Sequence, residues 1–260
     1  DSMRQYVIDA FTNQAFCGNP AAVCLTDHIL PEQLMQQIAI ENNLSETAFV
    51  CPEGQEYRLR WFTPGGEINL CGHATLASAY AVCRFLQPKL RQVRFQTLSG
   101  LLTVTRDAEF FSLDLPACPM KPTALLPEFF QAVGFRPTEA WLGEDLVLIA
   151  ENQDQVRQAV PNQSAIAGLE GLCLQITAPG CGEFDCVTRT FAPKCGVAED
   201  PVCGRAHCHI APFWMERLRK QSLLAFQASA RGGRLTCRLQ GERVILGGQA
   251  ALYAQSELFV

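Results

Sequence analysis

The sequence predicts an α+β protein of two pseudo-symmetric lobes, each a curled, mostly antiparallel sheet around one central helix. The chain has 260 residues, a length that fits two domains of about 130 residues each. A set of motifs also occurs once in each half. Apolar residues make up 48% and charged residues 18%, a composition that excludes a disordered chain or a coiled coil.

The repeated motifs keep nearly the same spacing in the two halves. The first half carries Phe62-Thr63-Pro64, Cys71-Gly72-His73-Ala74 and Phe95-Gln96-Thr97. The second half carries Phe191-Ala192-Pro193, Cys203-Gly204-Arg205-Ala206 and Phe226-Gln227-Ala228. Cys71 to Gln96 spans 25 residues and Cys203 to Gln227 spans 24. Each half therefore reads as a copy of one supersecondary unit.

Each copy is predicted to run strand, turn, helix, strand, hairpin. In the first copy, residues 57–62 alternate polar and apolar as a half-buried strand does, and 63–66 form a turn. Residues 74–86 contain no Gly or Pro and form a buried helix. We expect residues 95–105 and 110–115 to form a hairpin.

The remaining elements follow from local signals. Before the first copy, a helix starts at Pro31 and stops at Asn42-Asn43, and a strand resumes at 48–50. In the second copy, 235–239 and 243–246 pair as strands, and Pro212 should kink or end the helix. Three prolines in 116–122 mark the linker. We expect an N-terminal lobe over 1–117, to which a terminal strand near 251–260 can return, and a C-terminal lobe over 118–250.

Charge and cysteine content limit the partners and the compartment. The net charge is −5 and no long basic cluster occurs, so nucleic acid is not an expected partner. No apolar stretch approaches the roughly 18 residues of a membrane helix, and the first residues do not resemble a secretory leader. Thirteen cysteines without any CxxC pair favour a reducing, cytoplasmic environment and no metal site.

A Cys-Gly pair opens the predicted central helix of each half. Unpaired N–H groups and the helix dipole attract anions at such positions and lower the pKa of a thiol. If a pseudo-twofold axis relates the lobes, Cys71-Gly72-His73 and Cys203-Gly204-Arg205 converge on one pocket, whose ligand would be a small acidic molecule. The alternative is that these small residues only let the helix pack closely on the sheet.

Four segments, in this order, resemble the PhzF family of phenazine-biosynthesis-like isomerases. They are Gly18-Asn19-Pro20-Ala21-Ala22-Val23, Leu44-Ser45-Glu46-Thr47-Ala48-Phe49, Cys71-Gly72-His73-Ala74-Thr75-Leu76-Ala77 and Glu199-Asp200-Pro201-Val202. The resemblance continues through Gln227-Ala228-Ser229, Arg231-Gly232-Gly233 and Gly247-Gly248, so it covers nearly the whole chain. It implies the diaminopimelate epimerase fold, an active site between the lobes, and a fold that often pairs into homodimers.

The resemblance also implies an isomerase without cofactor or metal. The best-understood member moves a double bond in a hydroxylated cyclohexadiene carboxylate by shuttling a proton. Glu46 would be the general acid/base, and its apolar neighbours would desolvate it. Gly72 and His73 would contact substrate and stabilise developing charge, while Asp200 would hold a polar substituent. The alternatives are a solvated loop glutamate, a packed histidine and an aspartate that caps a helix.

One segment departs from the family pattern. After Glu-Asp-Pro-Val, the family reads Thr-Gly-Ser-Ala, and this chain has Cys203-Gly204-Arg205-Ala206. Arg205 could bind a carboxylate through two parallel hydrogen bonds, or could be a surface arginine that points away.

Cys203 opens a second interpretation. Epimerases and racemases of this fold place two thiols on opposite sides of a carbon, and Cys71 and Cys203 occupy the matching helix openings. Against this, His73-Ala74 stands where the epimerase pattern has Asn-Gly. A third possibility is a non-catalytic binder of a small acid.

Overall fold

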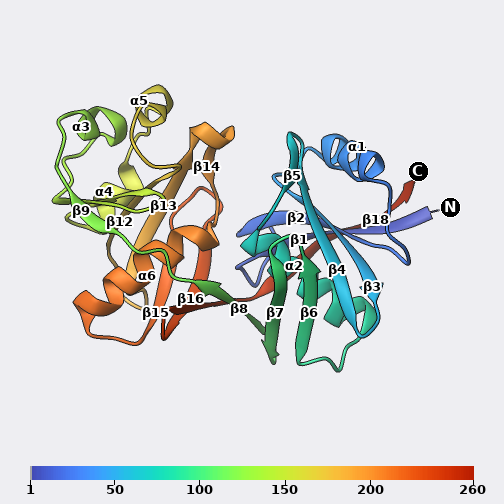
Figure 1. Cartoon of the computed structure of the whole chain (residues 1–260). Coiled ribbons are helices and arrows are strands. Elements are labelled where there is room, and N and C mark those ends of the chain that lie inside the picture. Colours follow the sequence, from blue (N-terminus) through green and yellow to red (C-terminus); the bar gives the residue numbers. More distant parts are fainter. Residues whose placement is uncertain (1) are drawn as a thin grey trace. The chain divides into compact units, whose positions relative to one another are not determined.

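The computed structural model describes residues 2–260 and divides the chain into two compact units. The N-terminal unit runs up to Asp114 and includes Gly247–Val260, and the C-terminal unit is Leu115–Leu246 (Figure 1). The sequence placed these boundaries at 117/118 and near 250.

The N-terminal unit is mostly sheet. Its strands are β1 (Ser2–Ala10), β2 (Asn19–Leu25), β3 (Thr47–Glu53), β4 (Glu56–Thr63), β5 (Gly66–Ile68), β6 (Gln92–Thr97), β7 (Gly100–Asp107), β8 (Phe110–Pro116) and β18 (Ala250–Phe259). Its helical segments are α1 (Glu32–Asn42), α2 (Gly72–Ala81) and the π-helical turn η1 (Val82–Leu86), which continues α2. The helix predicted from Pro31 is confirmed as α1, and Asn43 ends it in the left-handed conformation.

The C-terminal unit has more short helices. Its strands are β9 (Lys121–Thr123), β10 (Glu139–Leu142), β11 (Leu146–Ile149), β12 (Leu174–Pro179), β13 (Cys186–Ala192), β14 (Val197–Asp200), β15 (Ser222–Gln227), β16 (Gly233–Gln240) and β17 (Arg243–Gly248). Its helices are α3 (Glu128–Val133), α4 (Gln153–Gln158), α5 (Gln163–Ala167), the 3₁₀ turn η2 (Pro193–Cys195) and α6 (Gly204–Leu218).

The strands pair in the same sequence of directions in both units. In the N-terminal unit, β1–β2 is antiparallel, β2–β3 parallel, β3–β4 antiparallel, β4–β6 parallel and β6–β7 antiparallel. In the C-terminal unit, β10–β11, β11–β12, β12–β13, β13–β15 and β15–β16 repeat these directions in the same order. The predicted pseudo-symmetric α+β architecture is therefore confirmed.

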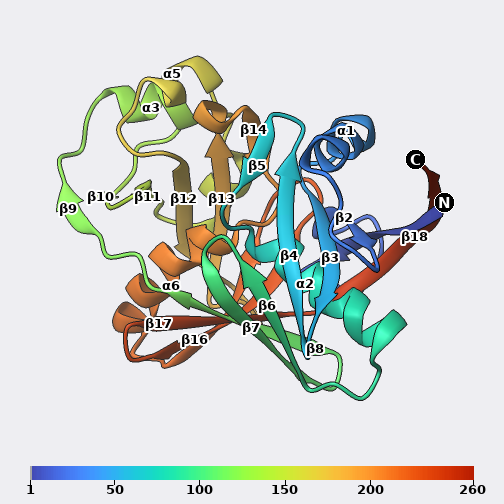
Figure 2. The same ribbon diagram turned by 45° about the vertical axis from the view of Figure 1, so that its right-hand side comes forward.

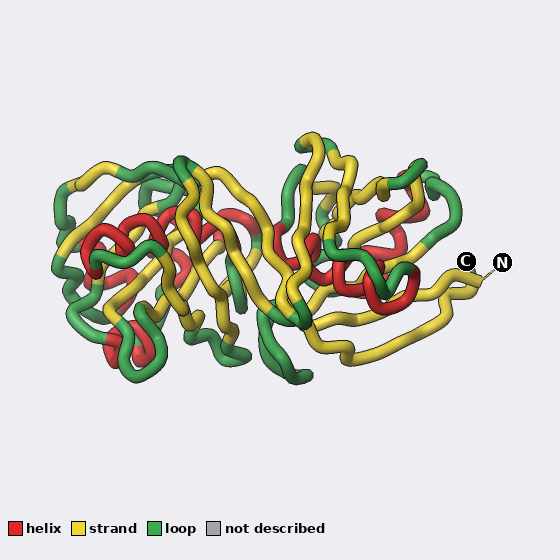
Figure 3. The backbone as a smooth tube through the Cα atoms, turned by 90° about the horizontal axis from the view of Figure 1, so that it is seen from below, coloured by secondary structure: helices red, strands yellow, loops and turns green. Residues whose placement is uncertain are grey.

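One long helix lies at the centre of each unit's sheet. Helix α2 contacts β1, β2, β3, β7 and β18, and α6 contacts β12, β15 and β16. Figure 3 shows these helices lying among the strands. Helix α2 is buried on nearly all sides, which suits its alanine-rich sequence. Its polar Thr75 and Ser78 are satisfied inside the helix, where their hydroxyls donate to the carbonyl oxygens of Cys71 and Ala74 at 2.6 and 2.7 Å.

Helix α6 continues through Pro212, so the prediction that it could end there is wrong. A proline has no N–H, and the carbonyl four residues earlier therefore loses its helical partner. That carbonyl belongs to Cys208, and it accepts a hydrogen bond from the N–H of Cys118 at 3.0 Å. A segment distant in sequence thus supplies the missing donor, and the helix tolerates the proline.

The predicted strand over 95–105 is broken into two. Strand β6 ends at Thr97, and the Thr97 hydroxyl accepts from the N–H of Ser99 and donates to the carbonyl of Gly100. Gly100 has a φ of 87°, so the chain reverses there into β7. Strands β7 and β8 then form the predicted hairpin, with Ala108 in the turn.

The last strand lies beside the first. Strand β18 pairs antiparallel with β1 from Ser2 opposite Phe259 to Ala10 opposite Ala250. Strand β1 is thereby hydrogen bonded on both edges, by β2 and by β18. Figures 1 and 2 show the two chain ends together at the tip of this pair. No helix among residues 2–260 is both long enough and apolar enough to span a bilayer.

Candidate functional site

The sheet of the N-terminal unit fixes the backbone of Glu46. Glu46 directly precedes β3, and its carbonyl accepts from the N–H of Ala22 at 3.2 Å, next to the parallel pairing of Ala22 with Thr47. The segment Gly18-Asn19-Pro20 lies at the start of β2, the strand that pairs in parallel with β3. A Cβ on Gly18 would lie 2.1 Å from the carbonyl oxygen of Ala10, and Gly18 has a φ of 68°, so only glycine fits.

Glu46 and His73 face each other in a buried position. Nε2 of His73 lies 2.9 Å from Oε2 of Glu46, and the side chains are 7% and 16% exposed. Apart from each other, neither atom has a hydrogen-bond partner among residues 2–260. The pair therefore brings together a carboxylate oxygen and an imidazole nitrogen that no other group of these residues engages.

Cys71 completes this group at the other ring nitrogen. Its Sγ lies 3.3 Å from Nδ1 of His73. Cys71 is the N-cap of α2 in extended conformation, and its carbonyl accepts from both the hydroxyl and the N–H of Thr75. We name Glu46, Cys71 and His73 the Glu-His-Cys group.

Burial and mutual contact shift the pKa values of two members of this group. Burial raises the pKa of the Cys71 thiol, and the negative charge of Glu46 adds to the increase. Burial opposes protonation of His73, but the adjacent Cys71 sulfur and Glu46 carboxylate outweigh it and raise the pKa of His73 well above 6.5.

Among residues 2–260, two groups have the donor types of a metal site, and in each group both imidazole nitrogens of the histidine already contact another group of the protein. In the Glu-His-Cys group, Nδ1 of His73 faces sulfur and Nε2 faces carboxylate, so the ring lies between the other two donors. The second group is Cys118, Glu144 and His209. Nδ1 of His209 contacts the carbonyl of Arg205 at 3.0 Å, and Nε2 accepts from the N–H of Asp145 at 3.3 Å. We assign no metal to either group.

In the C-terminal unit, Asp200 and Gln227 shape the second helix opening. The Oδ1 atom of Asp200 accepts from the N–H of Val202 at 3.2 Å. Gln227 is fully buried, accepts from the N–H of Cys203 at 2.9 Å and donates to the carbonyl of Asp200 at 2.8 Å. Ser229 donates to the carbonyl of Pro201 at 2.8 Å. The Gln227-Ala228-Ser229 motif thus holds the loop that presents Asp200 and Cys203.

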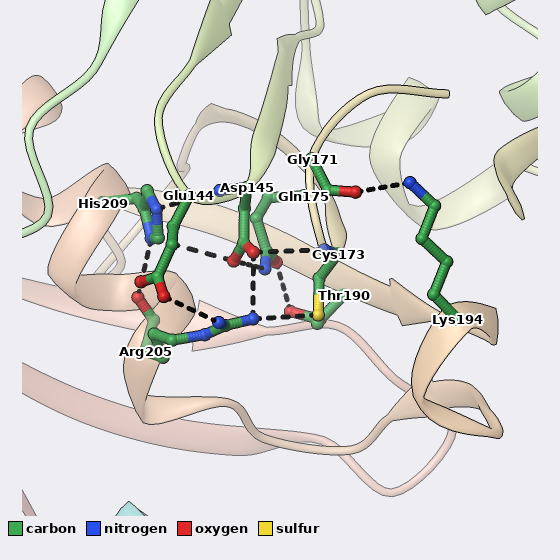
Figure 4. A network of polar contacts seen from close by, with 9 residues as sticks. All are labelled: Glu144, Asp145, Gly171, Cys173, Gln175, Thr190, Lys194, Arg205 and His209. Carbon is green, nitrogen blue, oxygen red and sulfur yellow. Dashed lines mark hydrogen bonds and ion pairs between the residues drawn. The ribbon is translucent and has the colours of Figure 1, made fainter. Parts of the chain in front are cut away.

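Arg205 points into the protein rather than away from it, as Figure 4 shows. Its Nη2 donates to Oδ1 of Asp145 at 2.9 Å and to Sγ of Cys173 at 3.0 Å, and its Nη1 lies 3.7 Å from Glu144. Asp145 has no exposed side-chain surface and also accepts from the N–H of Cys173 and from Gln175. The charge of Arg205 is therefore already paired with Asp145 inside the C-terminal unit.

The repeat places Cys173 where the first half has Glu46. The N–H of Leu146 donates to the carbonyl of Cys173 at 3.0 Å, and the N–H of Ala22 donates to the carbonyl of Glu46 in the same way. Cys173 directly precedes β12, which pairs in parallel with β11, and Glu46 directly precedes β3, which pairs in parallel with β2. By the same match Cys203 corresponds to Cys71 and Arg205 to His73. Sequence reasoning found neither Cys173 nor Asp145. Aligning the residue before each third strand of the repeat would have found Cys173.

Comparison with known proteins assigns the class and then the family. The repeated units with central helices define the diaminopimelate epimerase-like fold, which a hydroxyproline epimerase from Agrobacterium vitis shares at 11% identity (TM-score 0.61, 99% and 91% of the two chains covered). The family model for phenazine biosynthesis-like proteins (PhzC-PhzF) matches residues 8–256, and this chain belongs to that family.

Two relatives are similar over essentially their whole length. An uncharacterized isomerase of Pseudomonas aeruginosa is 45% identical over 252 residues, which cover 96% of each chain. The crystal structure of a PhzF-family protein from Enterococcus faecalis is 45% identical and covers 100% of both chains with a TM-score of 0.98.

Proposed function

We propose that the protein is a cofactor-independent isomerase that moves a proton on a small carboxylate-bearing metabolite, with Glu46 as the acid/base. The observation that carries the proposal is the buried 2.9 Å contact between Glu46 and His73, in which neither facing atom has another hydrogen-bond partner among residues 2–260. Membership in a family whose relatives are named isomerases supports the reaction class.

The proposed step uses only groups of the protein. The Glu46 carboxylate takes a proton from a carbon next to an unsaturated or carboxyl-bearing centre, and the electron pair of the broken C–H bond delocalises onto the substrate. The protonated Glu46 then returns the proton to a different carbon, so the double bond moves and nothing is oxidised or reduced. The substrate gains no atoms and loses none.

His73 would stabilise the charge that develops during this step. Its Nε2–H is buried beside Glu46 and has no other partner among residues 2–260, so it is placed to donate to an enolate-like oxygen of a substrate bound there. A raised pKa keeps the ring protonated near neutral pH, and a protonated ring stabilises a negative intermediate more strongly than a neutral one.

A two-thiol epimerase is the second candidate, because Cys71 and Cys203 are both N-caps of the central helices. One thiol would have to act as a thiolate. Burial raises the pKa of Cys71 and raises that of Cys203 well above its usual value, which opposes this role. A carboxylate base is the more favourable choice.

The other parts of the proposal stay predictions. Asp200, Cys71, Gly72, Cys203, Gly204 and Arg205 are predicted to contact the substrate. A cytoplasmic homodimer also remains a prediction.

Hydrogen exchange tests the proposal. The protein would be incubated in deuterated water with a panel of small carboxylic acids that carry an acidic C–H, and deuterium incorporation would be followed by mass spectrometry. Incorporation that is lost in Glu46→Gln and kept in Glu41→Gln, a control at an exposed glutamate of α1, supports the isomerase.

Other outcomes contradict it. Incorporation that persists in Glu46→Gln and disappears in Cys203→Ala would establish the two-thiol reaction. A panel member that binds without any incorporation would identify the protein as a non-catalytic binder.

A further inference from the structure

We propose that Cys71 is a positioning residue, whose sulfur holds the His73 ring so that Nε2, with its hydrogen, faces Glu46. The catalytic meaning of this role rests on the function proposed above. The role itself rests on the contacts within the Glu-His-Cys group and can be tested without a substrate.

The sulfur is fixed relative to the ring by covalent and hydrogen-bonded structure. Cys71 is the N-cap of α2, and its carbonyl accepts two hydrogen bonds from Thr75, at 2.6 Å from the hydroxyl and 3.1 Å from the N–H. His73 is the second residue of the same helix. The 3.3 Å Sγ–Nδ1 contact therefore joins two side chains whose backbones belong to one rigid helical turn.

The partner of one ring nitrogen decides what the other nitrogen carries. When His73 is neutral, the Cys71 thiol donates its S–H to Nδ1, because burial keeps the thiol protonated, and the ring hydrogen must then be on Nε2. When His73 is protonated, Nδ1–H donates to the sulfur and Nε2 again carries a hydrogen. In both states an N–H remains beside Oε2 of Glu46.

Comparison of the two helix openings distinguishes two roles of a cysteine: starting the helix, and contacting the ring of a histidine. Cys203 is the N-cap of α6 and is extended like Cys71, with φ and ψ of −111° and 113° against −146° and 110°. The residue two positions later is Arg205, which turns to Asp145. A cysteine suits both helix starts, but only the Cys71 sulfur contacts an imidazole.

The test is a nuclear magnetic resonance measurement of the ring nitrogens. Protein labelled with ¹⁵N-histidine contains four histidines, and His73→Gln assigns the signals of His73. Glu46 and Cys71 are the titratable groups that act on this ring, so spectra are recorded from mildly acidic to alkaline pH. We expect Nε2 to stay protonated throughout the wild-type series, with deprotonation seen at Nδ1 alone.

Variants decide whether the sulfur causes this pattern. In Cys71→Ala, we expect both nitrogens to shift on titration, as in a ring that exchanges between tautomers. His73 could keep both ring hydrogens over the whole pH series. In that case, a slowly exchanging Nδ1–H signal that is present in the wild type and lost in Cys71→Ala shows that the sulfur holds the ring. Cys71→Ser, which keeps a donor and acceptor, should restore the wild-type pattern, and Cys203→Ala should leave it unchanged.

Two results would overturn the proposal: a wild-type ring with its hydrogen on Nδ1, or a Cys71→Ala spectrum identical to the wild type. If a substrate is found, Cys71→Ala should slow deuterium incorporation about 10- to 100-fold, the usual effect of removing a partner that orients a working histidine. Cys83→Ala, a buried cysteine without an imidazole contact, controls for loss of packing. A positive spectrum without any turnover would refute the proposed function and leave the positioning role intact.

Discussion

Arg205 donates through Nη2 to Oδ1 of Asp145 at 2.9 Å, and Asp145 has no exposed side-chain surface. The pair ties the first turn of α6 to the residue that precedes β11. Glu144 adds a second negative charge 3.7 Å from Nη1. Arg205 therefore neutralises acidic side chains of its own unit, and its first role is structural.

Replacing Arg205 with alanine should lower the free energy of unfolding by about 2 kcal/mol. Asp145 would lose its cationic partner while it stays buried, although two other donors remain, and Arg205 is itself about a third exposed. Urea unfolding followed by circular dichroism measures the change. Arg58→Ala removes an ion pair between two exposed side chains and should cost under about 1 kcal/mol. Equal costs for the two variants would contradict this assignment.

His207 should make the protein less stable as the pH falls from about 6.5 to 4. Burial lowers the pKa of His207 from 6.5 to about 4. The unfolded chain therefore binds a proton in this range that the folded protein does not, and stability is lost toward the lower value. The loss amounts to about 3 kcal/mol.

Unfolding in urea at several pH values compares wild type with His207→Gln. The variant should lose this part of the pH dependence, whereas His28→Gln, at an exposed position, should keep it. A variant whose pH dependence matches the wild type would refute the prediction.

His73 should act in the opposite direction and in a higher pH range. Contacts with Cys71 and Glu46 outweigh burial and raise the pKa of His73 well above 6.5. A raised pKa gives stability that is fully present below 6.5 and is lost as the pH rises through the folded-state value. The difference in unfolding free energy between wild type and His73→Gln should thus shrink above pH 6.5. A difference that grows with pH would show that burial dominates.

Gly233→Ala should destabilise the protein by about 1–3 kcal/mol. A Cβ at this position would lie 2.2 Å from Cγ2 of Val202, which is fully buried in the loop after Asp200. Shortening the clashing side chain in the double variant Gly233→Ala/Val202→Ala should recover part of the loss, and the coupling energy of the cycle measures this directly. Gly65→Ala, which meets only Thr63 at 3.7 Å, is the control. Additive effects would exclude the clash.

Local sequence signals predicted the elements whose boundaries are local. Pro31 and Asn43 bracket α1, because a proline suits the first turn and an asparagine adopts the left-handed conformation that ends a helix. The matched Cys-Gly pairs predicted that both central helices open at equivalent places. The resemblance implied that Glu46 and His73 belong to one site but did not predict their direct contact, which arises because β2 and β3 pair in parallel beside α2.

Tertiary partners account for what the sequence did not predict. Pro212 stays helical because Cys118, far away in the chain, satisfies the carbonyl of Cys208. Asp145 resembles an ordinary turn aspartate, and its burial becomes intelligible only with Arg205, 60 residues later in the chain. Such contacts leave no periodic or compositional trace near either residue.

The pairing of β18 with β1 has a consequence for how the protein is made. Residues 115–246 form a continuous stretch and leave the ribosome before the final strand does. Most of the unit that holds Glu46 and His73 is synthesised before residues 115–246, yet β1 keeps an open hydrogen-bonding edge until residues 250–259 are translated. The N-terminal unit is therefore completed after the C-terminal unit, and a nascent chain that stops before Ala250 would expose an unpaired edge of β1 in the unit that contains Glu46.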